Sequence, residues 1–378
     1  MLMTVLRVAI VGGGLGGLSA ALALRAYGMQ ARVYEQAHQL GEIGAGIALY
    51  PNGLKILDRL GLRQQVSRIG TPLSAFCLYA PDGTLVSVER YGREATPLGI
   101  HHGDLQLVLA GALPDDVVHA GWRCIDFAQN DEVAAVSFDN GVTVEADVVI
   151  AADGIHSVLQ RYVVEPTEPV FSGMVAYRGL IPGAQLPDWP HDLVAWGGEG
   201  KHLMTYPVRA GELINYVGVV PANEQTGETS SNAASPAELT AEFADWNPQV
   251  RRLVTAVDTT SVFGLYDRDP LPRWVLGRLA LLGDAAHPML PHMAQGTNQA
   301  LEDAMALATL LRGATATDVP QALLRYQRLR LDRTARIQQY ARTNGIREDS
   351  ALAVSLGHPW VVNYDVERAA LDLLRTSE

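Results

Sequence analysis

The stretch LRVAIVGGGLGGLSAALALRAYGMQARVYE, residues 6–35, decides the fold of this chain. It opens with an apolar run, and Gly12, Gly14 and Gly17 follow in G-x-G-x-x-G spacing. An alanine- and leucine-rich segment then ends at Gly28, a residue type that commonly follows the last turn of a helix. The pattern predicts a βαβ unit, with two parallel strands joined by a right-handed helical crossover. The expected elements are a strand over residues 6–11, a helix over 15–27 and a strand over 31–35.

The glycines and one acid in this stretch have the chemistry of a dinucleotide site. Gly12 permits the turn out of the strand, Gly14 lets the backbone approach a pyrophosphate, and Gly17 lets helix and sheet pack closely. The helix beginning at Leu15 offers free N–H groups to phosphates. Glu35 stands 18 residues beyond Gly17, where a carboxylate accepts ribose hydroxyl protons. The first 35 residues therefore predict a bound dinucleotide.

Composition narrows the remaining possibilities. A chain of 378 residues is long enough for two domains, or for one large domain with an insertion. The 29 Lys and Arg residues against 41 Asp and Glu give a net charge of −12, which disfavours nucleic acid and anionic membrane surfaces as partners. Glycines interrupt the apolar N-terminus, so no membrane anchor is expected. The two cysteines form neither a disulfide framework nor a zinc site, so we expect a cytoplasmic protein without a metal site.

Two more apolar segments end in short acidic turns. The strand expected over residues 146–152 runs into Asp153, and the strand expected over 279–282 runs into Gly283 and Asp284. Between them the sequence alternates as half-exposed strands do, over residues 174–181, 193–196, 201–208 and 212–220. We therefore expect an α/β fold, a Rossmann-like domain with an inserted antiparallel sheet and a helical C-terminus. The expected division is a cofactor domain over 1–70, 100–168 and 270–313, a substrate domain over 71–99 and 169–269, and a C-terminal helical segment over 314–378.

Three local features carry further expectations. Residues 221–234 are polar and are expected to form a surface loop, after which Ser235 and Glu238 have the spacing of a helix capping box. Residues 325–342 are rich in arginine and form either a basic patch or a solvated amphipathic helix. The interleaved Leu329 and Ile337 favour the solvated helix.

Two motifs, taken with the N-terminal glycines, resemble a known family. They are ADGIHS, residues 152–157, and GDAAHPMLPHMAQG, residues 283–296. Three motifs in this order resemble the single-component flavoprotein aromatic hydroxylases, the family of para-hydroxybenzoate and salicylate hydroxylases, over nearly the whole chain. Within it, the second motif, VAYRGLI (175–181) and HPWVVNYD (358–365) look most like the 6-hydroxynicotinate 3-monooxygenases. The chain departs from those enzymes at Ala48 and Leu193, where they have His and Cys.

The resemblance implies that the dinucleotide is FAD, and it extends the cofactor site beyond the first motif. His102 stands where the family has an arginine, and Asp153 lies where the family handles flavin and nicotinamide. The helix expected near Asn298 would direct its positive end at the flavin. The cofactor residues implied are Gly12, Gly14, Leu15, Gly17, Glu35, His102, Asp153, Gly283, Asp284, Pro291, Gly296, Thr297 and Asn298.

The substrate side implied by the resemblance consists of His202, Tyr206 and His292. On a strand, alternate residues face the same side, so His202 and Tyr206 would line one surface. A base poised near neutrality, His202 or His292 with Tyr206 as its partner, would remove a phenol proton. Arg178 on a neighbouring strand would either meet a substrate carboxylate or form a structural ion pair.

The function expected is an FAD-dependent monooxygenase that uses NADH or NADPH and O2. It would hydroxylate a small aromatic or heteroaromatic ring, phenolic or carboxylated, through a flavin C4a-hydroperoxide. The alternative is an FAD-dependent reductase or dehydrogenase of related fold, and a non-catalytic flavin-binding protein is a third hypothesis. We expect a monomer or a homodimer.

Overall fold

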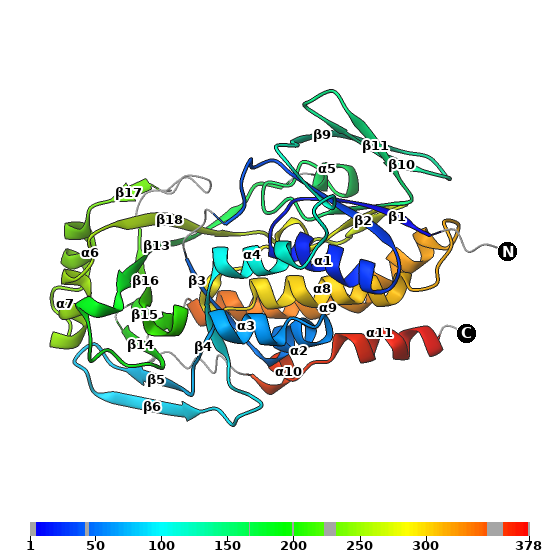
Figure 1. Ribbon diagram of the computed structural model, residues 1–378. Helices are drawn as coiled ribbons and strands as arrows, with labels where there is room; N and C mark the ends of the chain where they lie inside the picture. Colours follow the sequence, from blue (N-terminus) through cyan, green and yellow to red (C-terminus); the bar gives the residue numbers. More distant parts are fainter. Residues whose placement is uncertain are drawn as a thin grey trace.

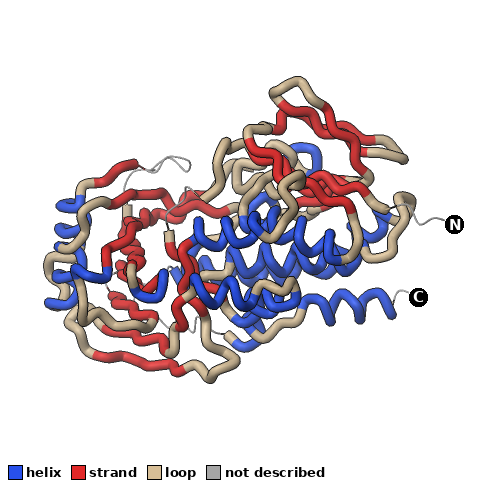
Figure 2. Tube along the Cα trace, in the orientation of Figure 1, coloured by secondary structure: helices blue, strands red, loops and turns tan. Residues whose placement is uncertain are grey.

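The computed structural model describes residues 5–41, 45–165, 167–198, 200–222, 232–345 and 358–376. Figure 2 shows a strand-rich end beside a body built largely of helices, with further strands along one side of that body. The α/β fold class expected from the sequence is confirmed.

A mainly parallel sheet runs through the helical body. In spatial order its strands are β19 (Val275–Leu276), β20 (Leu279–Leu281), β12 (Val148–Ala151), β1 (Arg7–Val11), β2 (Gln30–Glu35) and β8 (Val118–Ala120). All neighbouring pairs are parallel except β19 and β20. The central strands are apolar along their length because helices or strands cover both faces. The four strands expected here are confirmed, although the segment at 146–152 begins its parallel pairing only at Val148.

Helices pack in layers beside this sheet, as Figure 1 shows. Helix α8 (Gly296–Leu311) lies among α1 (Leu15–Ala26), α2 (Pro51–Arg59), α9 (Val319–Gly345) and α11 (Val366–Arg375). Every residue of α8 from Asn298 to Leu311 is buried, including four polar or charged ones near its start. A helix buried all round must find partners for such groups inside the protein.

Shorter elements complete the helical body. Two three-stranded sheets are formed by β11 (Thr143–Ala146), β10 (Ala134–Phe138) and β9 (Cys124–Gln129), and by β3 (Gly46–Leu49), β7 (Leu98–His101) and β4 (Thr71–Pro72). The remaining helices are α3 (Arg63–Ile69), α4 (His102–Gly111), α5 (Gln160–Val163) and α10 (Pro359–Val362). Short 3-10 turns lie at Gly183–Gln185, Arg209–Gly211, Gly283–Ala285 and Pro291–Met293.

An eight-stranded sheet forms the strand-rich end. Its spatial order is β17 (Asn232–Ala234), β18 (Thr260–Asp267), β13 (Val170–Pro182), β16 (Leu213–Pro221), β15 (Lys201–Val208), β14 (Leu193–Gly198), β5 (Ala75–Tyr79) and β6 (Leu85–Arg90). Only β14 and β5 pair in parallel. Helices α6 (Pro236–Glu242) and α7 (Pro248–Thr255) cover one face, where Leu203 packs with Phe243 and Trp246. The opposite face carries Tyr206 and Met204 and packs toward the helical body.

Of the three local features predicted from the sequence, one is confirmed and two are corrected in part. The capping box at Ser235 and Glu238 is confirmed. The loop expected over 221–234 is corrected at its ends, because Pro221 closes β16 and residues 232–234 form β17; residues 223–231 lie outside the described part. The arginine-rich segment is a helix, but Arg330 and Arg333 are buried in it, so the solvated helix was wrong for those two positions.

Candidate active site

The glycine turn after β1 has the geometry that its spacing predicted. Gly12 has a φ of +108°, and a Cβ there would lie 2.2 Å from the Ala152 carbonyl oxygen. A Cβ on Gly17 would lie 2.0 Å from the Gly12 carbonyl oxygen, so α1 crosses the strand end at a distance only glycine allows. Around Gly14 no atom lies within 4 Å of where a Cβ would be, which leaves its backbone open to a ligand.

Glu35 lies at the end of β2 and faces this turn. Its carboxylate accepts hydrogen bonds from the N–H groups of Gly13 at 2.5 Å and Ala37 at 2.7 Å. Gln106 supports the same turn, because its Nε2 donates to the Gly13 carbonyl oxygen at 2.8 Å. Gly13 and Gln106 escaped the sequence analysis, since neither belongs to the glycine spacing and Gln106 is 93 residues away in the chain.

Two adjoining cavities extend from the turn. The larger, of about 610 Å³, is lined by residues that include Glu35, Trp122 and Asp153. The smaller, of about 180 Å³, is lined by Leu15, His102, Gly283, Asp284, Gly296 and Thr297, among others. Both are also lined by Gly14, Ala152 and Gly154, so the two form one concave tract over the ends of β1 and β12.

Two helices begin at the smaller cavity without a side-chain cap. The N-cap residues are Gly14 for α1 and Gln295 for α8, and no described side chain accepts a hydrogen bond from either first turn. The first N–H groups of a helix have no partner within it, and their aligned dipoles favour negative charge. The cavity is therefore suited to an anionic or electron-rich group.

The acids at the tract are placed differently. Asp153 accepts from the Val158 N–H at 2.8 Å through Oδ2, whereas its buried Oδ1 has no partner among the described residues. Burial raises the pKa of Asp153. Asp284 is exposed at the smaller cavity, and desolvation by the surrounding protein atoms raises its pKa, with His287 opposing the rise and Asp303 adding to it.

His102 also lines the smaller cavity, at the start of α4. Burial lowers its pKa, and the neighbouring His101 and Arg178 add to the effect. Its buried Nδ1 has no partner among the described residues. The ring is therefore neutral and does not replace the fixed charge of the family's arginine.

Asn298 does not contact the tract through its side chain. The amide is fully buried; its Oδ1 accepts from the Tyr50 N–H, and its Nδ2 donates to the carbonyl oxygens of Ala48 and Ala294. All of these partners belong to the protein, and the cofactor role expected for Asn298 stays a prediction. Pro291 is exposed at the start of the turn before α8 and is not among the residues lining the two cavities.

Two of the three residues of the expected substrate side come together, and Tyr206 lies four residues beyond His202 on the same face of β15. The rings of His202 on β15 and His292 lie 5.4 Å apart at an interplanar angle of 67°. His202, Tyr206 and His292 are 8%, 5% and 6% exposed. The Nε2 of His292 is buried without a partner in the described part of the chain.

Burial sets the protonation of this group. It lowers the pKa of His202 from its ordinary value near 6.5 to about 3, with His292 adding to the effect, and lowers that of His292 to about 4. Burial also raises the pKa of Tyr206, which Arg178 opposes. The expectation of a histidine poised near neutrality is therefore corrected, because both rings are neutral at pH 7.

Strand register places Arg178 on the same face of the sheet. Arg178 on β13 pairs with Val217 on β16, which in turn pairs with Met204 on β15. Directly paired residues share a face, so Arg178 lies in one row with Met204, between the rows of His202 and Tyr206. No carboxylate of the described residues lies within ion-pair distance of Arg178, and its Nε has no partner there. The structural ion pair left open by the sequence is thus absent from the described part.

The sequence profile of the FAD binding domain family matches the chain over residues 5–341. The chain belongs to this family. Similar curated relatives are 3-amino-4-hydroxybenzoate 2-monooxygenase of Streptomyces cremeus, 37% identical over 89% of this chain and 86% of that protein, and 6-hydroxynicotinate 3-monooxygenase of Bordetella bronchiseptica, 35% identical over 95% of both. A solved salicylate hydroxylase in complex with its substrate covers 98% of both chains at 30% identity, with a TM-score of 0.84.

Membership of this family confirms the main functional hypothesis. The chain is an FAD-dependent aromatic hydroxylase, an oxidoreductase of the monooxygenase class that uses NAD(P)H and O2 on a small aromatic substrate. The reductase or dehydrogenase alternative gains no support from these relatives. In the described ranges no helix has both the length and the apolar character needed to cross a membrane.

Proposed function

We propose that this hydroxylase acts on a phenolic ring that carries an anionic group, held between the eight-stranded sheet and the turn containing His292. The observation that carries the proposal is Arg178, whose guanidinium has no carboxylate partner in the described chain and which lies in the row of Met204, between the rows of His202 and Tyr206. The names of three relatives point the same way, because hydroxybenzoate, hydroxynicotinate and salicylate each combine a ring hydroxyl with a carboxylate.

The residues of the cavity tract fit FAD. Glu35 would take the ribose of the adenosine half in the larger cavity, and the open backbone at Gly14 and Leu15 would take the pyrophosphate. Asp284, which faces the smaller cavity, would accept hydrogen bonds from the flavin side of the cofactor. The uncapped N–H groups of Gly296 and Thr297 would meet the flavin ring where negative charge collects on reduction. When bound, FAD takes a hydride from NADH or NADPH and activates O2 for transfer of one oxygen atom to the ring.

The side chains of the sheet would orient the substrate. A neutral imidazole has one nitrogen that accepts a hydrogen bond, so either His202 or His292 can accept from the O–H group of a phenolic substrate. Tyr206 keeps its own proton, because burial raises its pKa, and can donate a hydrogen bond to another polar group of the substrate. Met204 on this face and Met293 beside it contribute apolar walls that keep water from the reacting centre.

Activity of the purified protein tests the proposal. It should bind FAD, and hydroxylated benzoates and hydroxypyridine carboxylates should accelerate NADH or NADPH oxidation with one oxygen atom from O2 entering the product. Tyr206→Phe and His202→Ala should slow hydroxylation while FAD stays bound, whereas Asp284→Ala should weaken FAD binding. If no aromatic acid accelerated cofactor oxidation, or if the sheet variants lost FAD, the proposal would be wrong.

We further propose a cytoplasmic monomer or homodimer with the domain division given by the sequence. Free thiols at Cys77 and Cys124 support a reducing compartment. Residues 75–79 and 85–90 form the last two strands at one edge of the eight-stranded sheet, which supports grouping 71–99 with 169–269 as the substrate domain.

A further inference from the structure

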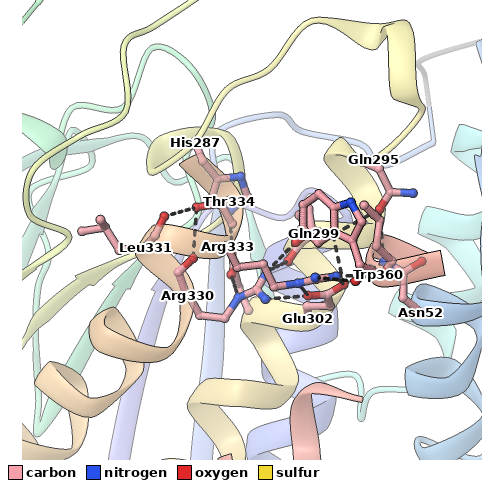
Figure 3. A network of polar contacts seen from close by, with 12 residues as sticks. Asn52, His287, Gln295, Gln299, Glu302, Arg330, Leu331, Arg333, Thr334 and Trp360 are labelled. Carbon is pink, nitrogen blue, oxygen red and sulfur yellow. Dashed lines mark hydrogen bonds and ion pairs between the residues drawn. The ribbon is translucent and has the colours of Figure 1, made fainter. Parts of the chain in front are cut away.

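A buried network of charged and amide side chains lies between α8 and α9, directly behind the turn that carries Asp284. Figure 3 shows Arg330 and Arg333 reaching from α9 toward Glu302 on α8, with His287 at one side. Arg330 and Glu302 are fully buried, as is Asp303, and together with Arg333 they balance two positive charges against two negative ones. Burying four ionised groups is costly, so the network calls for a physical explanation.

Asp303 is the member of the network that contacts the turn carrying Asp284, next to the smaller cavity. Its Oδ2 accepts from the backbone N–H of Gly283 at 3.0 Å and lies 2.6 Å from His287 Nε2, while its Oδ1 accepts from Arg330 Nε at 2.7 Å. Each oxygen therefore meets donors from a different element. The carboxylate ties α8 to α9 and to the turn after β20.

The turn held by Asp303 is the one that presents Asp284. Gly283 has a φ of +62°, a conformation that favours glycine, and Asp284 follows it directly into the smaller cavity. The N–H of Gly283 has no other acceptor among the described hydrogen bonds, so the Asp303 carboxylate is the side chain that holds this N–H, while the Gly283 carbonyl oxygen accepts from the N–H groups of Ala286 and His287. Arg330 and His287 in turn keep the pKa of Asp303 low despite its burial.

We propose that Asp303 is a positioning residue for FAD. By accepting a hydrogen bond from the Gly283 N–H, it fixes the turn that places Asp284 at the cofactor. Arg330 and His287 keep the Asp303 carboxylate ionised and oriented so that each oxygen meets its own donors. The inference rests on the proposed seat of FAD at Asp284.

A double-mutant cycle on FAD affinity tests this role. FAD is titrated into apoprotein, and binding is followed by quenching of flavin fluorescence, for wild type, Asp303→Asn, Asp284→Ala and the double variant. Loss of one hydrogen bond to a charged group corresponds to about a tenfold rise in Kd, which we expect for Asp303→Asn. Because Asp303 acts through Asp284, the double variant should bind FAD no more weakly than Asp284→Ala alone.

Arg333→Gln is the matched control. Arg333 joins the same network but contacts Glu302 and the carbonyl oxygens of Trp360 and Val361, away from the turn. Its substitution should lower the Tm of the apoprotein as Asp303→Asn does, yet change the Kd for FAD by no more than about twofold.

A second pair of variants covers the case in which Asp303→Asn does not fold. His287→Leu removes the donor to Asp303 and should weaken FAD binding, and His287→Gln, which restores a donor, should recover most of the affinity.

The outcomes separate the two proposals. An unchanged Kd in Asp303→Asn, full additivity with Asp284→Ala, or an equal loss in Arg333→Gln would overturn the positioning role. An unchanged Kd in Asp284→Ala would instead overturn the proposed FAD seat.

Discussion

The buried pair His202 and His292 should make the folded protein unstable in mild acid. Both rings have an ordinary pKa near 6.5 in the unfolded chain, and burial lowers the folded values to about 3 and about 4. Below pH 6.5 the unfolded state therefore binds two protons that the folded state does not bind. The contribution of the two histidines to the free energy of unfolding is therefore fully present above about pH 6.5. It is lost as the pH falls toward their pKa values in the folded state.

The magnitude follows from the size of that pH interval. Each histidine contributes a slope of about 1.4 kcal/mol per pH unit. Lowering the pH from 7 to 5 should therefore reduce the free energy of unfolding by about 2 kcal/mol for each ring and about 4 kcal/mol for the pair. This is a large part of the stability of an ordinary domain.

Urea unfolding of the apoprotein at pH 7 and pH 5 measures the effect. Wild type is compared with His202→Gln, His292→Gln and the double variant, and His191→Gln at an exposed position serves as the control. Each single variant should recover about 2 kcal/mol of the acid loss, and the control none of it. If the double variant lost as much free energy of unfolding as wild type, the neutral buried pair would be refuted.

Three further predictions test separate parts of the molecule. Gly17→Ala places a Cβ 2.0 Å from the Gly12 carbonyl oxygen, so helix and strand must separate. FAD titration should then show a loss of affinity of about five- to hundredfold, the effect of overpacking by roughly 1–3 kcal/mol. Arg178→Met should raise KM for carboxylated substrates by about tenfold or more while leaving that for uncharged phenols nearly unchanged, and an equal rise for both would exclude a carboxylate contact. Ser235→Ala removes the cap of α6 and should cost about 1 kcal/mol in denaturant unfolding with FAD affinity unaltered, since Ser235 accepts from the Ala237 N–H far from the cavities.

Much of the cofactor side could be predicted because it depends on local backbone geometry. The turn at Gly12 needs a positive φ, and the close crossing at Gly17 excludes any side chain. The positions of the glycines in the sequence therefore predict the backbone geometry of the turn. Glu35 follows at the end of the next strand for the same reason, since the length of one crossover helix fixes where that strand ends. The alternation of β15 likewise gave the shared face of His202 and Tyr206 before any partner strand was known.

Other features depend on residues distant in the sequence and could not be read locally. Asn298 sits in a conspicuous motif, yet its amide is used by the backbone of Tyr50 and Ala48, some 250 residues earlier. Arg330 is one of several arginines on α9, and its local sequence does not distinguish it from the solvated ones. Only the packing of α9 against α8 buries it beside Asp303.

The sequence by itself determined the βαβ unit, the glycine turn and the motifs of the cofactor site, because each of these rests on short-range sterics and hydrogen bonding. The tertiary structure alone decided which polar groups are buried and what faces them. Burial and long-range contacts set the protonation of His202 and His292, left Arg178 without an acid among the described residues, and tied Asp303 to the turn that carries Asp284. Desolvation and pairing depend on the whole three-dimensional surroundings of a group, which no local pattern of residues records.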